Sequence, residues 1–355
     1  MSATPTPSSH SHQAARPPTP ELDRLTLGFV PLLDAALLVI AREHGFFSEQ
    51  GLDVTLSREN AWSTLRDKVA AGLLDGAQML APMPLAMSLG LERAPCDTLA
   101  PITLSRNGNA LVLSSTLAEA GKVTLGDAPR ASALALARGL GGQPARRRPR
   151  LAMVYPFSCQ HYQLRDWLTL GGLDPEHDVE LVVLPPPRLA AALEAGEIDG
   201  FCAGEPWGSL AQFRHAGRIV ATGAQLWPEA PEKVLGVTRS WARRYPATLA
   251  ALIRSLMAAS RWLAAAPAHR RQALRWLALP PYLDRSVNHL DDLPLDSAPI
   301  HQRLYGDGVL RPDIEAMGRV AEALSRHLAG RGRQLDIGTL HECYAPVHFD
   351  AAMHH

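Results

Sequence analysis

Short apolar runs with a strand-like pattern alternate with longer stretches of helical periodicity along the first part of this chain. The pattern predicts strands at residues 24–30, 53–57 and 73–80, and helices at residues 34–44 and 63–71. Strands that are joined by helical crossovers are typical of an α/β fold with a largely parallel sheet, so we assign the chain to the α/β class.

The same alternation returns after residue 150, where strands are predicted at 150–155 and 179–184 and helices at 160–170 and 187–195. The sequence AGLLDG at residues 71–76 is echoed by AGEIDG at residues 195–200, and a Gly-Leu-Asp triplet precedes each of them. These echoes predict two similar lobes that arose by duplication. Ligands of such proteins usually bind in a cleft between the lobes.

The pattern becomes helical again near residues 246–280 and 312–328, with a polar, proline-containing loop predicted at residues 291–299. We expect these late helices to pack on the lobes or to bridge them. The predicted organisation is a disordered tail at residues 1–20, the first part of lobe 1 at 21–115, lobe 2 at 116–240, a helical return to lobe 1 at 241–335 and a C-terminal tail at 336–355.

The charge of the chain is balanced, because 35 Lys and Arg residues offset 35 Asp and Glu residues. A nucleic-acid coat or a membrane-surface binder would need a basic surplus or stripe, so the balance argues against both classes. The first residues lack the apolar stretch of a secretory signal, and the four cysteines lie far apart without a CxxC pair. We therefore expect a cytoplasmic protein without disulfides.

Standard catalytic and cofactor motifs are not found in the sequence. The pair Gly121 and Lys122 lacks the upstream glycine of a Walker loop. The His and Cys residues within 341–348 do not have the spacing of a structural zinc site, and Cys159 is closer to His161 than catalytic pairs usually are. We therefore assign no catalytic residue, no metal and no cofactor.

Two turns at helix starts carry the strongest chemical signal, residues 60–64 in the first lobe and residues 157–161 in the second. A helix N-terminus exposes unsatisfied N–H groups with positive partial charge, which suits a small anion. Trp62 and His161 each add a neutral side-chain donor. A tryptophan at a helix start is often only a packing residue, and that alternative stays open at this point.

Six motifs occur in an order that resembles a known family. They are residues 28–32 (GFVPL) with Asp34, residues 60–62 (NAW) with 66–68 (RDK), residues 107–109 (NGN), residues 185–187 (PPP), residues 204–207 (GEPW) and residues 231–233 (PEK). Together they resemble the nitrate- and bicarbonate-binding proteins of cyanobacterial-type ABC importers, within the NMT1/THI5-like solute-binding superfamily. The resemblance implies a two-lobe, periplasmic-binding-protein-like (type II) fold with a ligand cleft between the lobes.

In the nitrate-binding members of this family, a tryptophan, an amide, a histidine and a lysine hold the anion. The resemblance places these roles on Trp62, Asn109, His161 and Lys233. Asn109 departs from the usual glutamine, so the resemblance leaves open whether it meets the anion directly or through a water. Lys233 is one of only three lysines, and it implies nitrate rather than bicarbonate. The neighbours expected around these residues are Ser63, Thr64, Gln160 and Glu205.

The expected lack of an export signal makes the chain similar to the cytoplasmic NasS-type nitrate/nitrite sensors. In that family the ligand-free sensor binds and silences an RNA-binding antiterminator with an ANTAR domain, and nitrate or nitrite releases it. The resemblance therefore implies a sensor and not an enzyme. The alternatives are a nitrate-binding receptor subunit of an ABC importer and an enzyme of pyrimidine or thiamine-precursor metabolism on the same fold.

Overall fold

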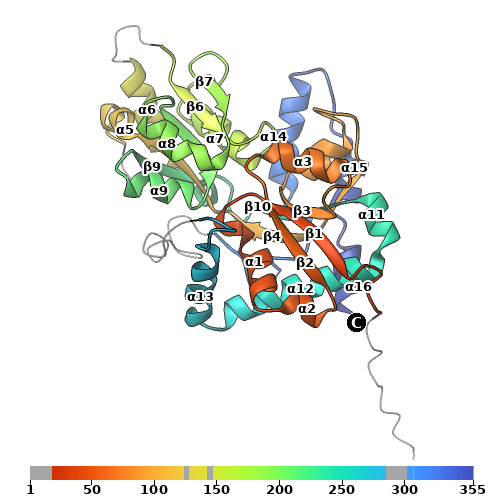
Figure 1. Cartoon of the computed structure of the whole chain (residues 1–355). Helices are drawn as coiled ribbons and strands as arrows, with labels where there is room; N and C mark the ends of the chain where they lie inside the picture. The colour runs from red at the N-terminus through yellow and green to blue at the C-terminus, as the bar shows by residue number, and fades with distance from the viewer. Residues whose placement is uncertain (1–17, 124–127, 142–146, 285–301, 307, 355) are drawn as a thin grey trace, which may run out of the picture.

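The computed structural model describes residues 18–123, 128–141, 147–284, 302–306 and 308–354. They form two lobes, each built on a five-stranded sheet with helices packed on it (Figure 1). The predicted two-lobe α/β architecture is therefore confirmed. The first 17 residues of the predicted tail and the predicted loop at residues 291–299 lie outside the described residues.

The sheet of lobe 1 has the strand order β2-β1-β3-β10-β4. Strand β1 pairs in parallel with β2 and β3, whereas β10 runs antiparallel to β3 and β4. The strands are β1 (Arg24–Phe29), β2 (Asp53–Arg58), β3 (Gly76–Leu80), β4 (Thr98–Arg106) and β10 (Pro231–Thr238).

The sheet of lobe 2 repeats this plan in the order β7-β6-β8-β5-β9. Strand β6 pairs in parallel with β7 and β8, and β5 runs antiparallel to β8 and β9. The strands are β5 (Asn109–Ser114), β6 (Arg150–Met153), β7 (Glu180–Val183), β8 (Gly200–Gly204) and β9 (Gly217–Thr222). Gly72 and Gly196 both adopt φ of 70°, which favours glycine, so the echoed sequences form equivalent turns before β3 and β8.

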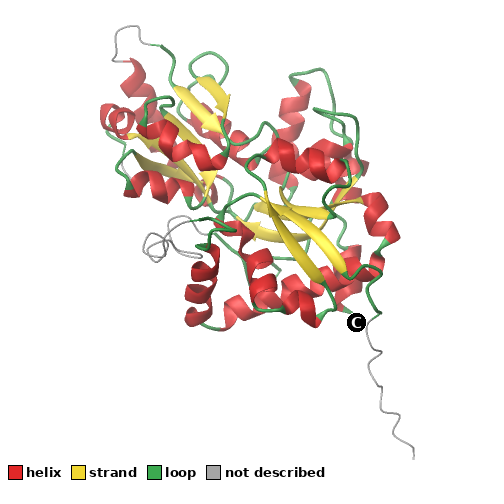
Figure 2. Ribbon diagram, in the orientation of Figure 1, coloured by secondary structure: helices red, strands yellow, loops and turns green. Residues whose placement is uncertain are grey.

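Helices cover both faces of each sheet (Figure 2). Lobe 1 carries η1 (Leu33–Ala35), α1 (Ala36–Glu43), α2 (Phe46–Glu49), α3 (Trp62–Ala70), α4 (Met83–Ser88), α11 (Arg239–Arg244), α12 (Pro246–Ala265), α13 (Pro267–Leu277), α15 (Ile337–Cys343) and α16 (Val347–Met353). Lobe 2 carries α5 (Ser115–Gly121), α6 (Pro129–Gly141), α7 (Cys159–Leu170), η2 (Pro186–Arg188), α8 (Leu189–Glu194), α9 (Trp207–Phe213) and α10 (Gly223–Leu226). Helix α14 (Gly318–Ala329) packs against α7 of lobe 2, where Arg326 pairs with Asp166.

The boundaries between the lobes differ from the predicted ones. Strand β5 lies in lobe 2, although residues 21–115 were assigned to lobe 1, because it pairs with β8 and β9. Strand β10 lies in lobe 1, although residues 116–240 were assigned to lobe 2, because it pairs with β3 and β4. Each lobe therefore contains one antiparallel strand that comes directly after a crossing from the other lobe, β5 in lobe 2 and β10 in lobe 1.

Three predicted elements also need correction. The strand predicted from residue 73 begins only at Gly76, because residues 73–75 complete the turn and Leu73 is 69% exposed. The helix predicted from residue 312 begins at Gly318, after a turn in which the Asp313 carboxylate accepts a hydrogen bond from the backbone N–H of Glu315. The predicted C-terminal tail, residues 336–355, contains α15 and α16, which bury Cys343 and Phe349.

Apolar side chains form three buried clusters that explain the layered structure. One cluster lies among α1, α12 and α13 in lobe 1, and another lies under α6 and α7 in lobe 2. The third is continuous across the junction, since it includes Leu32 and Trp62 of lobe 1 together with Ala110 and Trp207 of lobe 2. The two lobes therefore share one apolar contact around the place where the chain crosses between them.

Candidate functional site

In the part of the chain that the structure describes, two crossings between the sheets lie side by side. The first joins β4 to β5 through Asn107 and Gly108, and the second joins α10 to β10. The backbone N–H of Asn107 donates to the carbonyl of Ala230 over 3.1 Å, and the Arg106 guanidinium donates to the carbonyl of Glu229 over 2.7 Å. The residues that follow each crossing, at the starts of β5 and β10, therefore face each other at the centre of the molecule.

An irregularity in β10 places two consecutive side chains in this centre. Neighbouring residues of a regular strand point to opposite faces of the sheet. The register of β10 against β4 shifts between Pro231 and Lys233 and again between Lys233 and Val234. Such a β-bulge re-aims side chains, and here both Glu232 and Lys233 reach the lobe junction, where their charged atoms lie 2.8 Å apart.

Lys233 is fully buried and its charge is compensated by two carboxylates. Its Nζ lies 2.9 Å from Asp34 Oδ2 and 2.8 Å from Glu232 Oε1. Burial alone would lower the pKa of Lys233, but the two carboxylates raise it above its ordinary value, so the ammonium stays charged. Burial raises the pKa of Asp34 and of Glu232 against the opposing effect of Lys233. The Gln78 amide donates to the other Asp34 oxygen and accepts from the backbone N–H of Val30.

The Glu232 carboxylate also accepts hydrogen bonds from two buried amides of lobe 2. Gln160 Nε2 donates to Glu232 Oε1 over 2.6 Å, and Asn109 Nδ2 donates to Glu232 Oε2 over 2.6 Å. The second hydrogens of these amides go to Asn109 Oδ1 and to Gln163 Oε1 respectively. Glu232 therefore binds across the junction, with its backbone in lobe 1 and its amide partners in lobe 2.

Trp62, the first residue of α3, is close to the charged centre. The Lys233 ammonium lies 5.7 Å from the centroid of the Trp62 ring, within the range of a cation–π contact. The Trp62 indole is 1% exposed, and its Nε1 has no hydrogen-bond partner among the described residues. The structure thus brings together Trp62, Asn109 and Lys233, three of the four residues predicted to hold the anion.

His161 differs from the predicted role of a neutral donor. Because the Pro156 carbonyl can only accept, the His161 Nδ1 at 2.6 Å must carry the proton and donate it. Burial lowers the pKa of His161 to about 4, so the ring is neutral at neutral pH and its Nε2 is an acceptor. The ring packs on Tyr162 and His327, one residue further along α7 than Gln160 and so turned by about 100° from it.

The predicted neighbours fall into two groups. Ser63 and Thr64 are exposed on α3, so they do not surround the anion position as expected. Gln160 and Glu205 are buried at the junction. The Glu205 carbonyl accepts from the backbone N–H of Leu33 over 2.8 Å, and its carboxylate accepts from the backbone N–H of Ser209.

Burial raises the pKa of Glu205 to about 7. The neighbouring Gly204 shows how closely the lobes approach there, since a Cβ on it would lie 3.5 Å from Asp34 Oδ2 and 3.6 Å from Asn109 Oδ1. Side-chain atoms beyond a Cβ at position 204 would therefore press on both sides of the charged centre.

Asp34, Glu232, Gln78 and Gln163 complete the site, and none of them was predicted as a site residue. Asp34 and Glu232 lie within the motifs that carry the family resemblance, but the resemblance assigns the anion contact to other positions. The signal that could have found the two carboxylates is chemical, because a buried lysine requires compensating charge.

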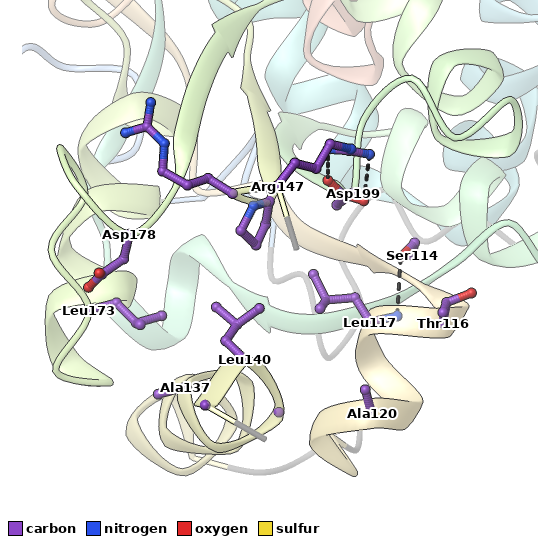
Figure 3. A pocket seen from close by; sticks show the side chains of 14 residues that line it. Ser114, Thr116, Leu117, Ala120, Ala137, Leu140, Arg147, Leu173, Asp178 and Asp199 are labelled. Atoms are coloured by element: carbon purple, nitrogen blue, oxygen red, sulfur yellow. Dashed lines mark hydrogen bonds and ion pairs between the residues drawn. The ribbon is translucent and has the colours of Figure 1, made fainter. Parts of the chain in front are cut away.

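A cavity with a volume of about 740 Å³ lies elsewhere, in lobe 2 (Figure 3). Leu117 of α5 and Leu140 of α6 line it, together with an ion pair of 2.8 Å between Arg147 and Asp199. The side chains of this ion pair are partly exposed, and they do not form a converging set of buried donors. We therefore place the candidate site at Lys233, where every polar side chain is buried.

Cys159 and Cys343, which were considered above as candidate site residues, are both buried and hydrogen-bonded to backbone carbonyls. The Cys159 thiol donates to the carbonyl of Pro231 over 3.5 Å, and burial raises its pKa well above its ordinary value. The Cys343 thiol donates to the carbonyl of Thr98 over 3.2 Å. Within the described residues no group of three or more His, Cys, Asp or Glu side chains could hold a metal ion. In the same part of the chain, no helix has the length and apolar character needed to cross a membrane.

Comparison with known proteins identifies the family. The chain matches the model of the NMT1-like family over residues 18–278. It is 43% identical over 268 residues to the nitrate import ATP-binding protein NrtC of Synechocystis, covering 75% of this chain and 38% of the relative. It is 34% identical over 269 residues to the nitrate/nitrite binding protein NrtA of Synechococcus elongatus, covering 73% of this chain and 58% of the relative. The chain thus spans only part of the length of these curated relatives.

Solved structures show the same fold. The periplasmic nitrate-binding protein NrtA from Synechocystis superposes with a TM-score of 0.81 at 24% identity, covering 94% of this chain and 89% of that one. The desulfurization enzyme DSZB superposes with a TM-score of 0.58 at 17% identity, covering 94% of this chain and 99% of that one. At these identities the likeness concerns the fold alone. Because the family model covers most of the sequence, from the start of lobe 1 to the end of α13, the chain belongs to the NMT1-like family.

Proposed function

We propose that this chain binds nitrate or nitrite at the site around Lys233. The observation that carries the proposal is the way the Glu232 carboxylate is held: a planar oxyanion accepts hydrogen bonds from an ammonium group and two amides beside an indole ring. Nitrate is also planar and carries one negative charge. The names of NrtC and NrtA, which refer to nitrate import and to nitrate/nitrite binding, support the same ligand.

The chemistry of the donors favours a weakly hydrated monovalent anion. A compact ammonium supplies one point charge without the rigid fork of arginine, which suits carboxylate and phosphate groups. A doubly charged anion such as sulfate would leave a larger uncompensated charge in the buried site. We therefore expect nitrate and nitrite to bind more tightly than sulfate. The family resemblance carried by Lys233 implies that they also bind more tightly than bicarbonate.

We further propose that the protein is a cytoplasmic sensor that acts by protein–protein contact, not as an enzyme. In this proposal the ligand-free form sequesters an ANTAR-domain antiterminator, and the anion releases it. A site between two lobes supports such a role, because a ligand there can shift their arrangement toward one that the partner does not bind. Linkage then requires that the partner weaken anion binding by the same factor.

A receptor subunit of an ABC importer is the second candidate. The observation that favours it is the similarity to NrtC, whose name refers to nitrate import. Both candidates require the same anion site. They differ in the partner that recognises the arrangement of the lobes, which is an antiterminator for the sensor and a transporter for the receptor subunit.

The proposal is tested by two measurements on the full chain. Calorimetric titrations with sodium nitrate, sodium nitrite, sodium bicarbonate and sodium sulfate should give saturable binding for the first two and much weaker binding for the others. A pull-down from nitrate-starved cells, repeated with added nitrate, should recover an ANTAR-domain protein only without nitrate. Absence of nitrate and nitrite binding would overturn the anion site, whereas binding without any such partner would overturn the sensor.

A further inference from the structure

We propose that the Glu232 carboxylate is an internal occupant of the anion site, and that an incoming monovalent anion replaces it with the uptake of one proton from solvent. This inference rests on the proposed function. It adds that the ligand must displace the Glu232 carboxylate and that one proton is bound together with the ligand.

The hydrogen bonds of the site leave neither the Asn109 amide nor the Gln160 amide a free hydrogen for a ligand. Asn109 Nδ2 has two hydrogens, which go to Glu232 and Gln163, and Gln160 Nε2 has two, which go to Glu232 and Asn109. The bonds of both amides to Glu232 are 2.6 Å long, which is at least as short as usual charge-assisted hydrogen bonds from nitrogen donors. An anion can gain these donors only if the Glu232 carboxylate gives them up.

Two buried polar atoms are unsatisfied while Glu232 occupies the site. Trp62 Nε1 is a donor with no partner among the described residues, and Gln160 Oε1 is an acceptor with none. A buried polar atom without a partner is energetically unfavourable, so each favours a state that satisfies it. An anion beside Trp62 can accept from the indole N–H, and a protonated Glu232 has an O–H donor to offer to Gln160.

The charge of the site requires the proton. Lys233 with ionised Asp34 and Glu232 gives a buried charge of about −1, and a second anion would raise it to about −2 at a large desolvation cost. If one carboxylate is protonated as the anion enters, the buried charge is unchanged. The titratable groups that face Glu232 are Lys233 on β10, Asp34 on η1, Cys159 on α7 and Cys202 on β8.

Glu232 is the carboxylate that takes the proton in this scheme. Burial keeps the thiols of Cys159 and Cys202 protonated, because it raises their pKa values well above the ordinary one. Asp34 is bound by Gln78 and Lys233 within lobe 1, whereas Glu232 holds the amides of lobe 2 that the anion needs. Neutral Glu232 is a weaker acceptor than the ligand, so the amides pass from it to the anion.

The test is a calorimetric titration with sodium nitrate between pH 6.5 and pH 8.5, in two buffers of different ionisation enthalpy. Uptake of one proton predicts that the Kd of the native chain rises by up to about tenfold per pH unit, with about one proton taken up per nitrate. The Glu232→Gln variant should bind nitrate with a pH-independent Kd, at least about tenfold tighter than the native chain at pH 8.5, and without proton uptake. Glu59 is a buried glutamate that pairs with Lys68 away from the site, so Glu59→Gln should keep the native slope.

The outcomes separate the two proposals. Nitrate binding by the native chain with no proton uptake and a flat pH profile would overturn the role of Glu232 and leave the anion site standing. A native slope that persists in Glu232→Gln would also overturn it, because the proton would then be bound elsewhere. Failure of both proteins to bind nitrate, with both folded by melting temperature, would overturn the proposed function itself.

Discussion

Lys233 is charged in a fully buried position because Asp34 and Glu232 compensate it. Removing one partner of a buried ion pair leaves an uncompensated charge and is usually strongly destabilising. The three residues therefore act as one unit, and in the proposed function their net charge determines which ligand can enter. A site described by its lysine alone would be expected to bind any small anion. In our proposal the unit accepts an anion only if the negative charge of Glu232 is neutralised.

His161 should make the protein less stable in acid. Its pKa of about 4 is below the ordinary value of 6.5, so the unfolded chain binds the proton more tightly, and stability falls as the pH drops through this window. The loss amounts to about 2 kcal/mol at pH 5 relative to pH 7. In His161→Asn, urea unfolding should show that this part of the pH dependence is gone.

The control for His161 is the same substitution at His177, which is exposed and pairs with Asp174. His177→Asn should keep the acid-induced loss of stability that His161 causes. If His161→Asn retained the full native pH dependence, the neutral, buried state of His161 would be contradicted.

Glu205 should have the opposite effect. Burial raises its pKa to about 7, so the folded chain binds the proton more tightly, and stability is lost as the pH rises from about 4.5 through 7. Glu205→Gln removes this loss and should be more stable relative to the native chain at pH 8 than at pH 5, by up to about 3 kcal/mol in urea unfolding. Glu59→Gln serves as the control, and an equal effect of both substitutions at both pH values would argue against a protonated Glu205.

At the scale of elements, the first turn of helix α7 carries the site residue Gln160, and Ser158 caps this turn. The Ser158 hydroxyl accepts from the backbone N–H of His161 over 3.1 Å and donates to the carbonyl of Tyr155 over 2.6 Å. Ser158→Ala removes this cap and should lower the unfolding free energy by about 1 kcal/mol, and by more if the freed carbonyl is left unpaired.

The matched control is Ser63→Ala, because Ser63 is exposed within the first turn of α3, where the N-cap residue Ala61 makes no side-chain cap. It should change the unfolding free energy by less than about 0.5 kcal/mol. Equal effects of the two substitutions in urea unfolding would show that the Ser158 cap does not stabilise α7.

Local elements could be predicted from the sequence, but the pairing of strands β5 and β10 could not. The helix predicted at 160–170 and the strand predicted at 24–30 agree with α7 and β1 within one residue, because periodicity and turn signals act over a few residues. The exchange of β5 and β10 between the sheets is a long-range pairing that leaves no local pattern. The bulge in β10 also leaves no pattern in the sequence. The side chain of Glu232 was therefore not expected to point to the same place as that of Lys233.

At the scale of the whole molecule, contacts on both sides of the crossings hold the lobes together around the site. Trp207 Nε1 of lobe 2 donates to the Pro31 carbonyl of lobe 1 over 3.1 Å, and Arg66 of lobe 1 donates to the Tyr155 hydroxyl of lobe 2 over 2.9 Å. Glu92 of lobe 1 accepts from the same Tyr155 hydroxyl and pairs with Arg66. If an anion binds at this junction as proposed, its exchange should require these contacts to open.

The packing of the two lobes also determines which parts of the site could be predicted from the sequence. Trp62, Asn109 and Lys233 were named from motifs, and the fold brings them together because each follows a strand end or a crossing at the junction. The tautomer of His161 and the exposure of Ser63 and Thr64 depend on how α7 and α3 are rotated against the sheets. That rotation is set by packing, which motif spacing does not specify.

The most direct test of the account is nitrate binding by Lys233→Ala, measured by calorimetry beside Lys68→Ala. Lys68 is the control because its ammonium pairs with Glu59 at a partly exposed position away from the site. The account predicts that Lys68→Ala binds nitrate like the native chain, and that folded Lys233→Ala binds it at least about a hundredfold more weakly, as for the loss of a charged hydrogen bond of about 3 kcal/mol. Unchanged nitrate affinity in Lys233→Ala would contradict the anion site at the lobe junction.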